Sequence, residues 1–256
     1  MIPYAHIADA LANAEVTRRP IAAIRSQAQL AVADAYGIQL HNVRRRTATG
    51  ERIVGMKIGL TSKAMQALLG VEEPDYGHLL SAMRVEDSMP ASELIAPRIE
   101  PEIGVILERP LTGPGVTELD VLAATSSVVP ALEIIDSRIS AWDIALVDTI
   151  ADNGSSARFV LGNRSAAPSG IDLRTLGVAL EKNGHVVATG AGAAVLGAGP
   201  LLGVAWLANA LAPFGISLSA GEVVLTGALC AAVAVEAGDA FVASFAELGD
   251  VGVRFT

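Results

Sequence analysis

The sequence predicts an α+β protein in which a mixed β-sheet core follows an N-terminal helical segment. Apolar residues recur at helical spacing in the first 46 residues, whereas short apolar runs bounded by glycine and proline dominate from residue 53 onward. A length of 256 residues fits one large core better than two complete domains. We therefore expect a helical segment at 1–50 and one β-rich core at 51–256.

The first 46 residues are predicted to be helical. Ile7 and Leu11 share one helical face. Further along, residues at the same spacing are Leu30, Ala33, Tyr36, Leu40 and Val43. Three arginines at 44–46 would complement the negative end of the second helix dipole, and Gly50 follows that end.

Strands are predicted in the rest of the chain at 53–60, 98–107, 128–135, 173–181, 185–189, 222–226, 231–235, 240–245 and 250–255. Asn183-Gly184 between two apolar runs predicts a two-residue hairpin. A second turn is expected at 236–239. Short helices are predicted at 62–69, 117–126 and 201–211.

Composition and charge exclude several classes of protein. Hydrophobic residues make up 52% and charged residues 18%, which is not the composition of a disordered chain. A net charge of −9 argues against a nucleic-acid partner. Cys230 is the only cysteine, so an intrachain disulfide is impossible and a reducing, cytoplasmic location is expected.

Residues 186–221 carry no charged side chain and are long enough to raise the question of a membrane span. Glycines and Pro200 interrupt this stretch, and no basic cluster flanks it. We therefore expect a buried strand, a glycine loop and a helix, with no membrane partner. The N-terminus has no basic region before an apolar run, so no signal peptide is expected.

The segment 97–107 (PRIEPEIGVIL) is the most informative part of the sequence. On a strand, Glu100 and Glu102 would point to one face, about 7 Å apart, while the aliphatic residues would face the core. Gly104 leaves space beside Glu102. Two neighbouring carboxylates repel each other unless a cation lies between them. A half-exposed strand with polar residues facing water explains this segment equally well.

Glu133 is the single carboxylate within the apolar run 128–135. An ionised carboxylate is costly to bury without a partner, and that partner is either a metal ion or a basic residue such as Arg138 or a nearby lysine. Three carboxylates without a histidine or thiolate cluster would suit Mg²⁺ or Mn²⁺ better than zinc.

Lys57 lies in the predicted strand 53–60, where Gly55 and Gly59 share its face. The glycines leave room for a ligand over the lysine. Desolvation would lower the pKa of Lys57 toward a value suited to acid–base catalysis. The alternative is a lysine that reaches the surface or pairs with an acid.

Other catalytic motifs are incomplete. Gly190-Ala-Gly192 has Val195 where a dinucleotide-binding loop needs its third glycine. Phosphate-binding loops and the GxSxG motif do not occur, and the four histidines are too scattered for a local metal motif. Cys230 lies among small apolar residues and is expected in the core.

Several short motifs occur in a characteristic order. They are IVGMKIGLTSK (53–63), EPDYG (73–77), RIEPE (98–102), PALEIIDSR (130–138), DTIADN (148–153) and GEVVLTG (221–227). With these motifs the chain resembles the 2-keto-4-pentenoate hydratase (2-hydroxypenta-2,4-dienoate hydratase) family, within the fumarylacetoacetate hydrolase superfamily. The resemblance covers nearly the whole chain, and it implies the strongly twisted mixed sheet of that superfamily's C-terminal fold.

The resemblance implies a role for each residue that matches a motif. Glu100, Glu102 and Glu133 would bind a divalent metal, Mg²⁺ or Mn²⁺. Lys57 and Asp75 would transfer protons. Substrate contacts would come from Ser155, Ser156, Thr226 and Gly227.

The implied reaction is the addition of water to 2-hydroxypenta-2,4-dienoate, which yields 4-hydroxy-2-oxopentanoate in meta-cleavage degradation of aromatic compounds. The first alternative is 4-oxalocrotonate (2-oxo-3-hexenedioate) decarboxylase on the same scaffold. The sequence of residues 226–235 favours this alternative. The hydratase is favoured by the sequences at 140–142 and 147–149, and by Lys63 together with residues 73–75.

A second alternative is a non-catalytic structural subunit of a partner enzyme. The intact set of Lys57, Asp75 and three glutamates argues against it, because a structural role would not require that set. Acylpyruvate hydrolysis is a third alternative, for which no suitable histidine is apparent. The resemblance also implies a homo-oligomer and possible association with neighbouring pathway enzymes.

Overall fold

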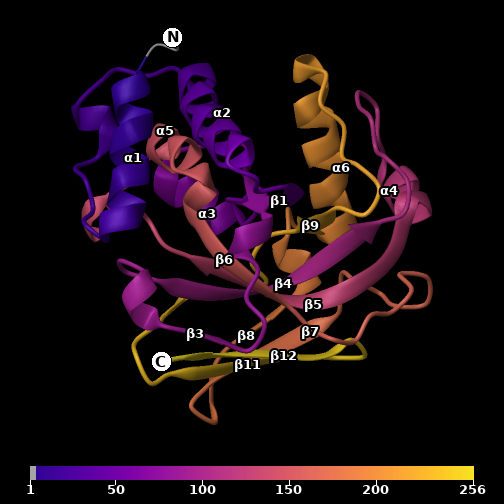
Figure 1. The fold of residues 1–256 in the computed structure, drawn as a ribbon. Coiled ribbons are helices and arrows are strands. Elements are labelled where there is room, and N and C mark those ends of the chain that lie inside the picture. The colour runs from indigo at the N-terminus through magenta and orange to yellow at the C-terminus, as the bar shows by residue number, and fades with distance from the viewer. Residues whose placement is uncertain (1–3) are drawn as a thin grey trace.

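Two β-sheets packed face to face form the centre of the computed structural model, which describes residues 4–256 (Figure 1). The larger sheet has the order β2 (Asp75–Leu80), β1 (Ile53–Gly59), β9 (Val223–Leu225), β4 (Arg98–Leu107), β5 (Thr125–Ile135) and β6 (Ser156–Leu161), with β10 (Val233–Ala234) paired to β4. Its strands are antiparallel except for the parallel pair β1 and β9, so the sheet is mixed as predicted.

The second sheet has the order β3 (Ser88–Met89), β12 (Gly249–Phe255), β11 (Ala240–Phe245), β7 (Gly177–Lys182) and β8 (His185–Ala191). It packs against β5 and β6 of the larger sheet. The principal hydrophobic core contains side chains of both sheets together with residues of two helices, α4 (Glu118–Ala124) and α6 (Pro200–Leu211).

The remaining helices are α1 (Ala5–Thr17), α2 (Val32–Ala48), α3 (Lys63–Leu69) and α5 (Leu146–Ala151). α1, α2 and α5 gather in one group, and α4 packs with α6 in another (Figure 1). Ile7, Leu11, Ile38 and Ile150 form a second core inside the first group. Single turns of 3₁₀ helix occupy Ile24–Ser26, Ser81–Met83, Ala91–Glu93, Ser140–Trp142, Asn153–Ser155, Gly192–Ala194 and Ala212–Phe214.

Several predicted elements are confirmed. β7 and β8 form the hairpin predicted at Asn183-Gly184, with Lys182 paired to His185. α3, α4 and α6 lie within a few residues of the helices predicted at 62–69, 117–126 and 201–211. The charge-free stretch 186–221 contains most of β8 and all of α6, but the expectation of a buried strand is wrong, because β8 is largely exposed. No helix in the described part of the chain combines the length and apolar character that crossing a membrane requires.

The helical prediction for the first 46 residues is confirmed over α1 and α2 but is wrong for most of the connection between them, and the first three residues lie outside the described part. Arg18 adopts a left-handed conformation with φ of 54° and closes α1. Pro20 then disfavours helical geometry at Arg19. A bridge between Ile21 and Ile139 ties this connection to the residues that follow β5.

Three strands and one helix were not predicted, and two predicted strands are clearly shorter than expected. β2, β3, β6 and α5 are the additional elements. The strand predicted at 173–181 begins at Gly177, because the Asp172 carboxylate accepts hydrogen bonds from the Arg174 amide at 3.1 Å and the Thr175 hydroxyl at 2.8 Å, which forms a turn. The strand predicted at 231–235 is reduced to β10.

Candidate metal centre and active site

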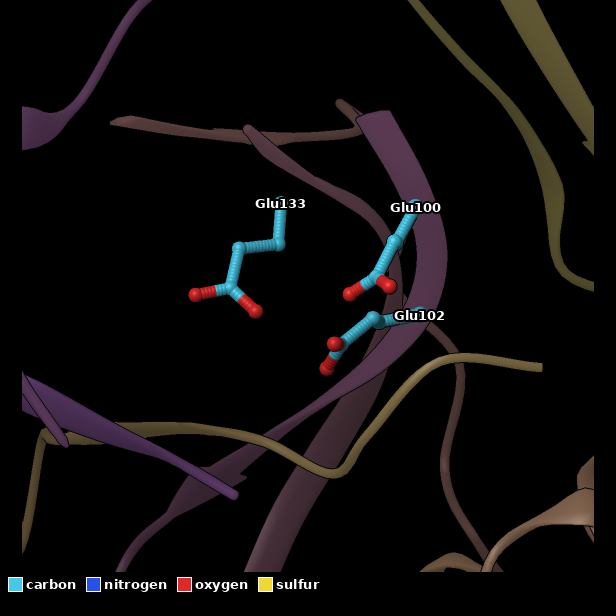
Figure 2. Close-up of side chains that lie close together, drawn as sticks. All are labelled: Glu100, Glu102 and Glu133. Carbon is cyan, nitrogen blue, oxygen red and sulfur yellow. The ribbon is translucent and has the colours of Figure 1, made fainter. Parts of the chain in front are cut away.

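Three glutamates from neighbouring strands converge on one face of the larger sheet. Glu100 of β4 lies directly opposite Glu133 of β5 in the antiparallel register, and Glu102 is the next residue on the same face of β4. One carboxylate oxygen from each residue lies within 4.8 Å of the others. Figure 2 shows the three carboxylates directed into a shared space. The strand register therefore assembles the acids that the sequence placed far apart.

The chemistry of this cluster fits a hard divalent cation. Glu102 and Glu133 are 1% and 0% exposed, and their Oε1 atoms accept no hydrogen bond. Burial, followed by the charge of Glu133, raises the pKa of Glu102 and raises that of Glu100 to about 7. Buried carboxylates with free oxygens and mutual repulsion are expected to bind a cation, and all-oxygen ligands are those preferred by Mg²⁺ and Mn²⁺.

The amide of Gly227 orients one carboxylate of this cluster. Its N–H donates a hydrogen bond of 2.8 Å to Glu102 Oε2. Gly227 has φ of 108°, and a Cβ atom there would lie 2.4 Å from Thr61 Oγ1. The position therefore requires glycine both for its backbone conformation and for the close approach of Thr61.

Lys57 is buried next to the acid cluster. Its Nζ lies 3.3 Å from Glu133 Oε2 and donates a hydrogen bond of 3.0 Å to the carbonyl of Gly154. Lys57, rather than Arg138, is thus the basic partner of Glu133. It is only 3% exposed, so the alternative of a lysine that reaches the surface is excluded.

The predicted lowering of the Lys57 pKa is wrong. Burial by itself lowers the pKa, but the charges of Glu133, Asp75 and the other two glutamates outweigh it and raise the pKa above the ordinary lysine value. Lys57 is therefore held as a cation in this arrangement.

A strained turn presents the Gly154 carbonyl to Lys57. Asn153, Gly154 and Ser155 all have positive φ, at 58°, 61° and 56°. Left-handed conformations of residues other than glycine are costly and are maintained only when the surrounding structure enforces them. A Cβ atom at Gly154 would lie 3.2 Å from Lys57 Cδ, so the turn packs directly against the lysine side chain.

A buried ion pair holds this turn in place. Arg138 Nε lies 2.5 Å from Asp152 Oδ1, and Arg138 Nη1 donates to the carbonyls of Asp136 at 2.6 Å and Ser156 at 3.2 Å. Arg138 and Asp152 are 5% and 3% exposed. Sequence reasoning did not identify this pair.

Replacing Arg138 by leucine is expected to lower the free energy of unfolding by about 3–5 kcal/mol, because Asp152 would remain buried without its partner. Urea denaturation measures this change. Arg158→Leu is the control, since Arg158 pairs with the more exposed Glu93 at 3.5 Å and its loss should cost at most about 1 kcal/mol. Equal losses in the two variants would contradict the structural role of Arg138.

Asp75 lies near Lys57 on the neighbouring strand. It begins β2, pairs across the strands with Gly59, and is 1% exposed. Its Oδ2 accepts a hydrogen bond of 3.3 Å from the hydroxyl of Thr149 in α5, and its Oδ1 has no hydrogen-bond partner. Burial raises the pKa of Asp75, while the charge of Lys57 and the Thr149 hydrogen bond lower it. Sequence reasoning did not name Thr149 as a site residue.

The predicted substrate-binding residues occupy different environments. Ser155 and Ser156 are buried, and neither hydroxyl has a hydrogen-bond partner. Ser156 lines a separate cavity of about 50 Å³ between the N-terminal helices and the sheet, and none of the residues discussed above as metal or proton-transfer candidates lines that cavity. The hydroxyl of Thr226 donates to the carbonyl of Ile103 at 2.9 Å, so it stabilises the strand pairing.

A curled mixed sheet that carries an all-oxygen acid cluster beside a buried lysine and aspartate defines a candidate metal-dependent enzyme acting on small molecules. Residues 73–256 match the model of the fumarylacetoacetate (FAA) hydrolase C-terminal family, and the chain belongs to this family. The resemblance and the fold predicted from the motifs are thereby confirmed.

Relatives of two activities match most of the chain. A 2-hydroxypent-2,4-dienoate hydratase of Pseudomonas putida is 50% identical over 215 residues, which cover 82% of this chain and 96% of that protein. A 4-oxalocrotonate decarboxylase of Pseudomonas putida is 46% identical over 252 residues, which cover 97% and 95%.

Among solved structures, the 4-oxalocrotonate decarboxylase of Pseudomonas putida G7, complexed with magnesium and adipate, superposes with a TM-score of 0.95 at 45% identity. The match covers 98% of this chain and 97% of that one.

Proposed function

We propose that the protein is a metal-dependent hydratase that adds water to 2-hydroxypenta-2,4-dienoate and forms 4-hydroxy-2-oxopentanoate in meta-cleavage degradation of aromatic compounds. The observation that carries the proposal is the cluster of half-buried Glu100 with buried Glu102 and Glu133 beside Lys57 and Asp75. The high identity to a dienoate hydratase over most of the chain supports it. Since a decarboxylase matches nearly as well, 4-oxalocrotonate decarboxylation is the second candidate.

Glu100, Glu102 and Glu133 would hold Mg²⁺, or Mn²⁺ in its place. The bound ion would supply Lewis-acid polarisation of the substrate's carboxylate and 2-oxygen end. The three glutamates would also keep other anions away from the site, since their charges exceed that of one divalent cation.

Lys57 and Asp75 are the proposed proton-transfer residues. The proton lost from the 2-hydroxyl returns at C5, and water then adds its hydroxyl at C4 and its proton at C3. Because Lys57 is held as a cation by its acidic neighbours, we assign it the donor role. Asp75, with an unpartnered Oδ1, is assigned the acceptor role.

Ser155, Ser156, Thr226 and Gly227 remain the proposed substrate-binding residues. Of these, Ser155 offers a free buried hydroxyl next to the Gly154 turn, and Gly227 contacts the ligand Glu102. We further propose that residues 51–256 form the catalytic core and that residues 1–50 cover it. A cytoplasmic location is supported by the free Cys230, and a homo-oligomer by the exposed Val186, Val187 and Val242 of the second sheet.

The deciding experiment compares two substrates with the purified Mg²⁺-loaded protein. 2-Hydroxypenta-2,4-dienoate should be converted to 4-hydroxy-2-oxopentanoate, observed as loss of the dienoate absorbance and formation of the product. 2-Oxo-3-hexenedioate is assayed for CO₂ in parallel. Release of CO₂ without hydration of the monoacid would replace the hydratase assignment by the decarboxylase.

Thr149→Val is expected to lower kcat about threefold to tenfold, which corresponds to the loss of roughly one hydrogen bond. The Thr149 hydroxyl lowers the pKa of Asp75, so its removal raises that pKa and moves the acidic limb of the pH–rate profile to higher pH. Thr175→Val, which removes a turn hydroxyl bonded to Asp172, is the control. A lower kcat with an unshifted acidic limb would show that Thr149 does not act through Asp75.

A further inference from the structure

β2 is an edge strand of the larger sheet, and two side-chain amides bind its backbone. Asn153 Oδ1 accepts a hydrogen bond of 2.8 Å from the His78 N–H, and Asn153 Nδ2 donates one of 3.0 Å to the His78 carbonyl. The buried Gln39 Nε2 donates to the Tyr76 carbonyl at 3.0 Å. A neighbouring strand offers the same pair of donor and acceptor to the residue opposite it. Asn153 therefore takes the place of a strand residue beside His78.

The backbone of Asn153 packs against β2 as closely as its side chain does. A Cβ atom at Gly77 would overlap the Asn153 carbonyl oxygen, so this approach requires glycine at position 77. The φ of 58° at Asn153 is left-handed, a conformation that asparagine adopts more readily than most other residues. The side chain and the backbone of Asn153 thus both fix the turn at 153–155 to β2.

The contact between Asn153 and β2 joins the two segments that hold the proposed proton-transfer residues. Asp75 begins β2, and the carbonyl of Gly154, the residue after Asn153, accepts the 3.0 Å hydrogen bond from Lys57 Nζ. A Cβ atom at Gly59 would overlap Asp75 Oδ1 and would lie 3.2 Å from Lys57 Nζ, so these two charged groups lie close together above Gly59. A movement of the turn against β2 would therefore change the geometry between Lys57 and Asp75.

We propose that Asn153 is a positioning residue for proton transfer. Its amide holds the turn against β2, and the Gly154 carbonyl then holds the Lys57 ammonium group in a fixed place relative to Asp75. A displacement of about 1 Å between reacting groups can cost about 100-fold in rate, so this contact is expected to affect catalysis directly. The inference rests on the proposed function, because it takes Lys57 and Asp75 as the proton-transfer pair.

Binding of the metal and of the substrate should depend little on the Asn153 amide. Within the described residues 4–256, the side-chain hydrogen bonds of Asn153 go to His78 and to none of the three glutamates. Ser155, the proposed substrate-binding residue of the same turn, is held separately, because its carbonyl accepts a hydrogen bond of 2.8 Å from the Asp136 amide. Loss of the Asn153 amide is therefore expected to change kcat more than KM.

Asn153→Gly tests the inference, since glycine adopts the left-handed backbone without strain and the variant removes only the side-chain amide. With the Mg²⁺-loaded protein and 2-hydroxypenta-2,4-dienoate, kcat should fall about tenfold to 100-fold, and KM should stay within about threefold of wild type. Thermal unfolding should show that the variant folds and keeps the stabilisation by Mg²⁺. Asn153→Asp keeps the acceptor for the His78 N–H and loses the donor to its carbonyl, so kcat should fall about threefold to tenfold. If Asn153→Gly does not fold, Asn153→Asp decides by the same split between kcat and KM.

Asn183→Gly is the matched control. Asn183, in the β7–β8 turn, also has a left-handed φ, of 54°, and its amide also donates one hydrogen bond, to Asp239 Oδ1 at 2.9 Å, and accepts one, from the Ala240 N–H at 2.8 Å. This variant should keep kcat and KM within about twofold of wild type. A wild-type kcat in Asn153→Gly, a raised KM with unchanged kcat, or an equal loss of kcat in Asn183→Gly would overturn the role of Asn153 and leave the proposed function in place. A wild-type protein that does not hydrate the dienoate would refute the proposed function, and this inference with it.

Discussion

Replacing Glu102 by glutamine is expected to lower Mg²⁺-dependent turnover of 2-hydroxypenta-2,4-dienoate at least about 100-fold, while the fold stays intact. Loss of even an indirect metal partner commonly reduces metal affinity or activity by about 10–100-fold, and Glu102 is a proposed direct ligand. The glutamine can still accept the hydrogen bond from the Gly227 amide, so the local backbone arrangement is retained.

Thermal unfolding with and without Mg²⁺ separates loss of the metal site from loss of the fold. Wild-type protein should gain about 2.7 kcal/mol at a Mg²⁺ concentration of 100 times Kd, and Glu102→Gln should lose this gain. Without Mg²⁺ the variant should be at least as stable as the wild type, because one of three mutually repelling carboxylates is removed. The control Glu86→Gln, at a side chain that is 76% exposed, should behave as wild type. Wild-type turnover in Glu102→Gln would refute the assignment of the metal ligands.

Lys57→Met is expected to lower kcat about 10²–10⁴-fold, the range typical of a lost general acid or base. The variant also removes the cation that lies 3.3 Å from Glu133 Oε2. The metal-free variant should therefore be less stable than the metal-free wild-type protein, because buried Glu133 loses its basic partner. Steady-state kinetics and thermal unfolding measure the two effects.

The stabilisation by Mg²⁺ distinguishes this variant from Glu102→Gln. Lys57 is not a proposed ligand, so Lys57→Met should retain or enlarge the stabilisation. Lys63→Met is the control, since Lys63 is exposed on α3 and bonds only to Gln66, and it should leave kcat within about twofold of wild type. A kcat equally reduced in both lysine variants would argue against proton transfer by Lys57.

The local sequence pattern was sufficient to predict those elements whose conformation is determined by their own residues. The alternation in 98–107 placed Glu100 and Glu102 on one face and the aliphatic residues on the other, as β4 has them. The Asn183-Gly184 pair specified the β7–β8 turn because its conformation suits few other residues.

Elements that depend on distant partners were missed. β2 contains Asp75, Gly77 and His78, residues with little preference for strands, and it exists because it pairs with β1. α5 is short, and its first turn is capped by the Asp148 carboxylate, which accepts from the Ala145 amide at 2.8 Å and also binds Arg25. Contacts between segments that are distant in the sequence cannot be predicted from a short stretch of residues.

The sequence by itself determined the residue chemistry of this protein: acids in an apolar strand, a lysine between glycines, and the motifs that identify the family. Only the tertiary structure decided how these groups act on one another. The pKa of Lys57 rises rather than falls because four acids from three different strands surround it, and burial alone would have lowered it. Charge interactions depend on distances through space, and those distances are set by strand register and loop conformation, which no local pattern specifies.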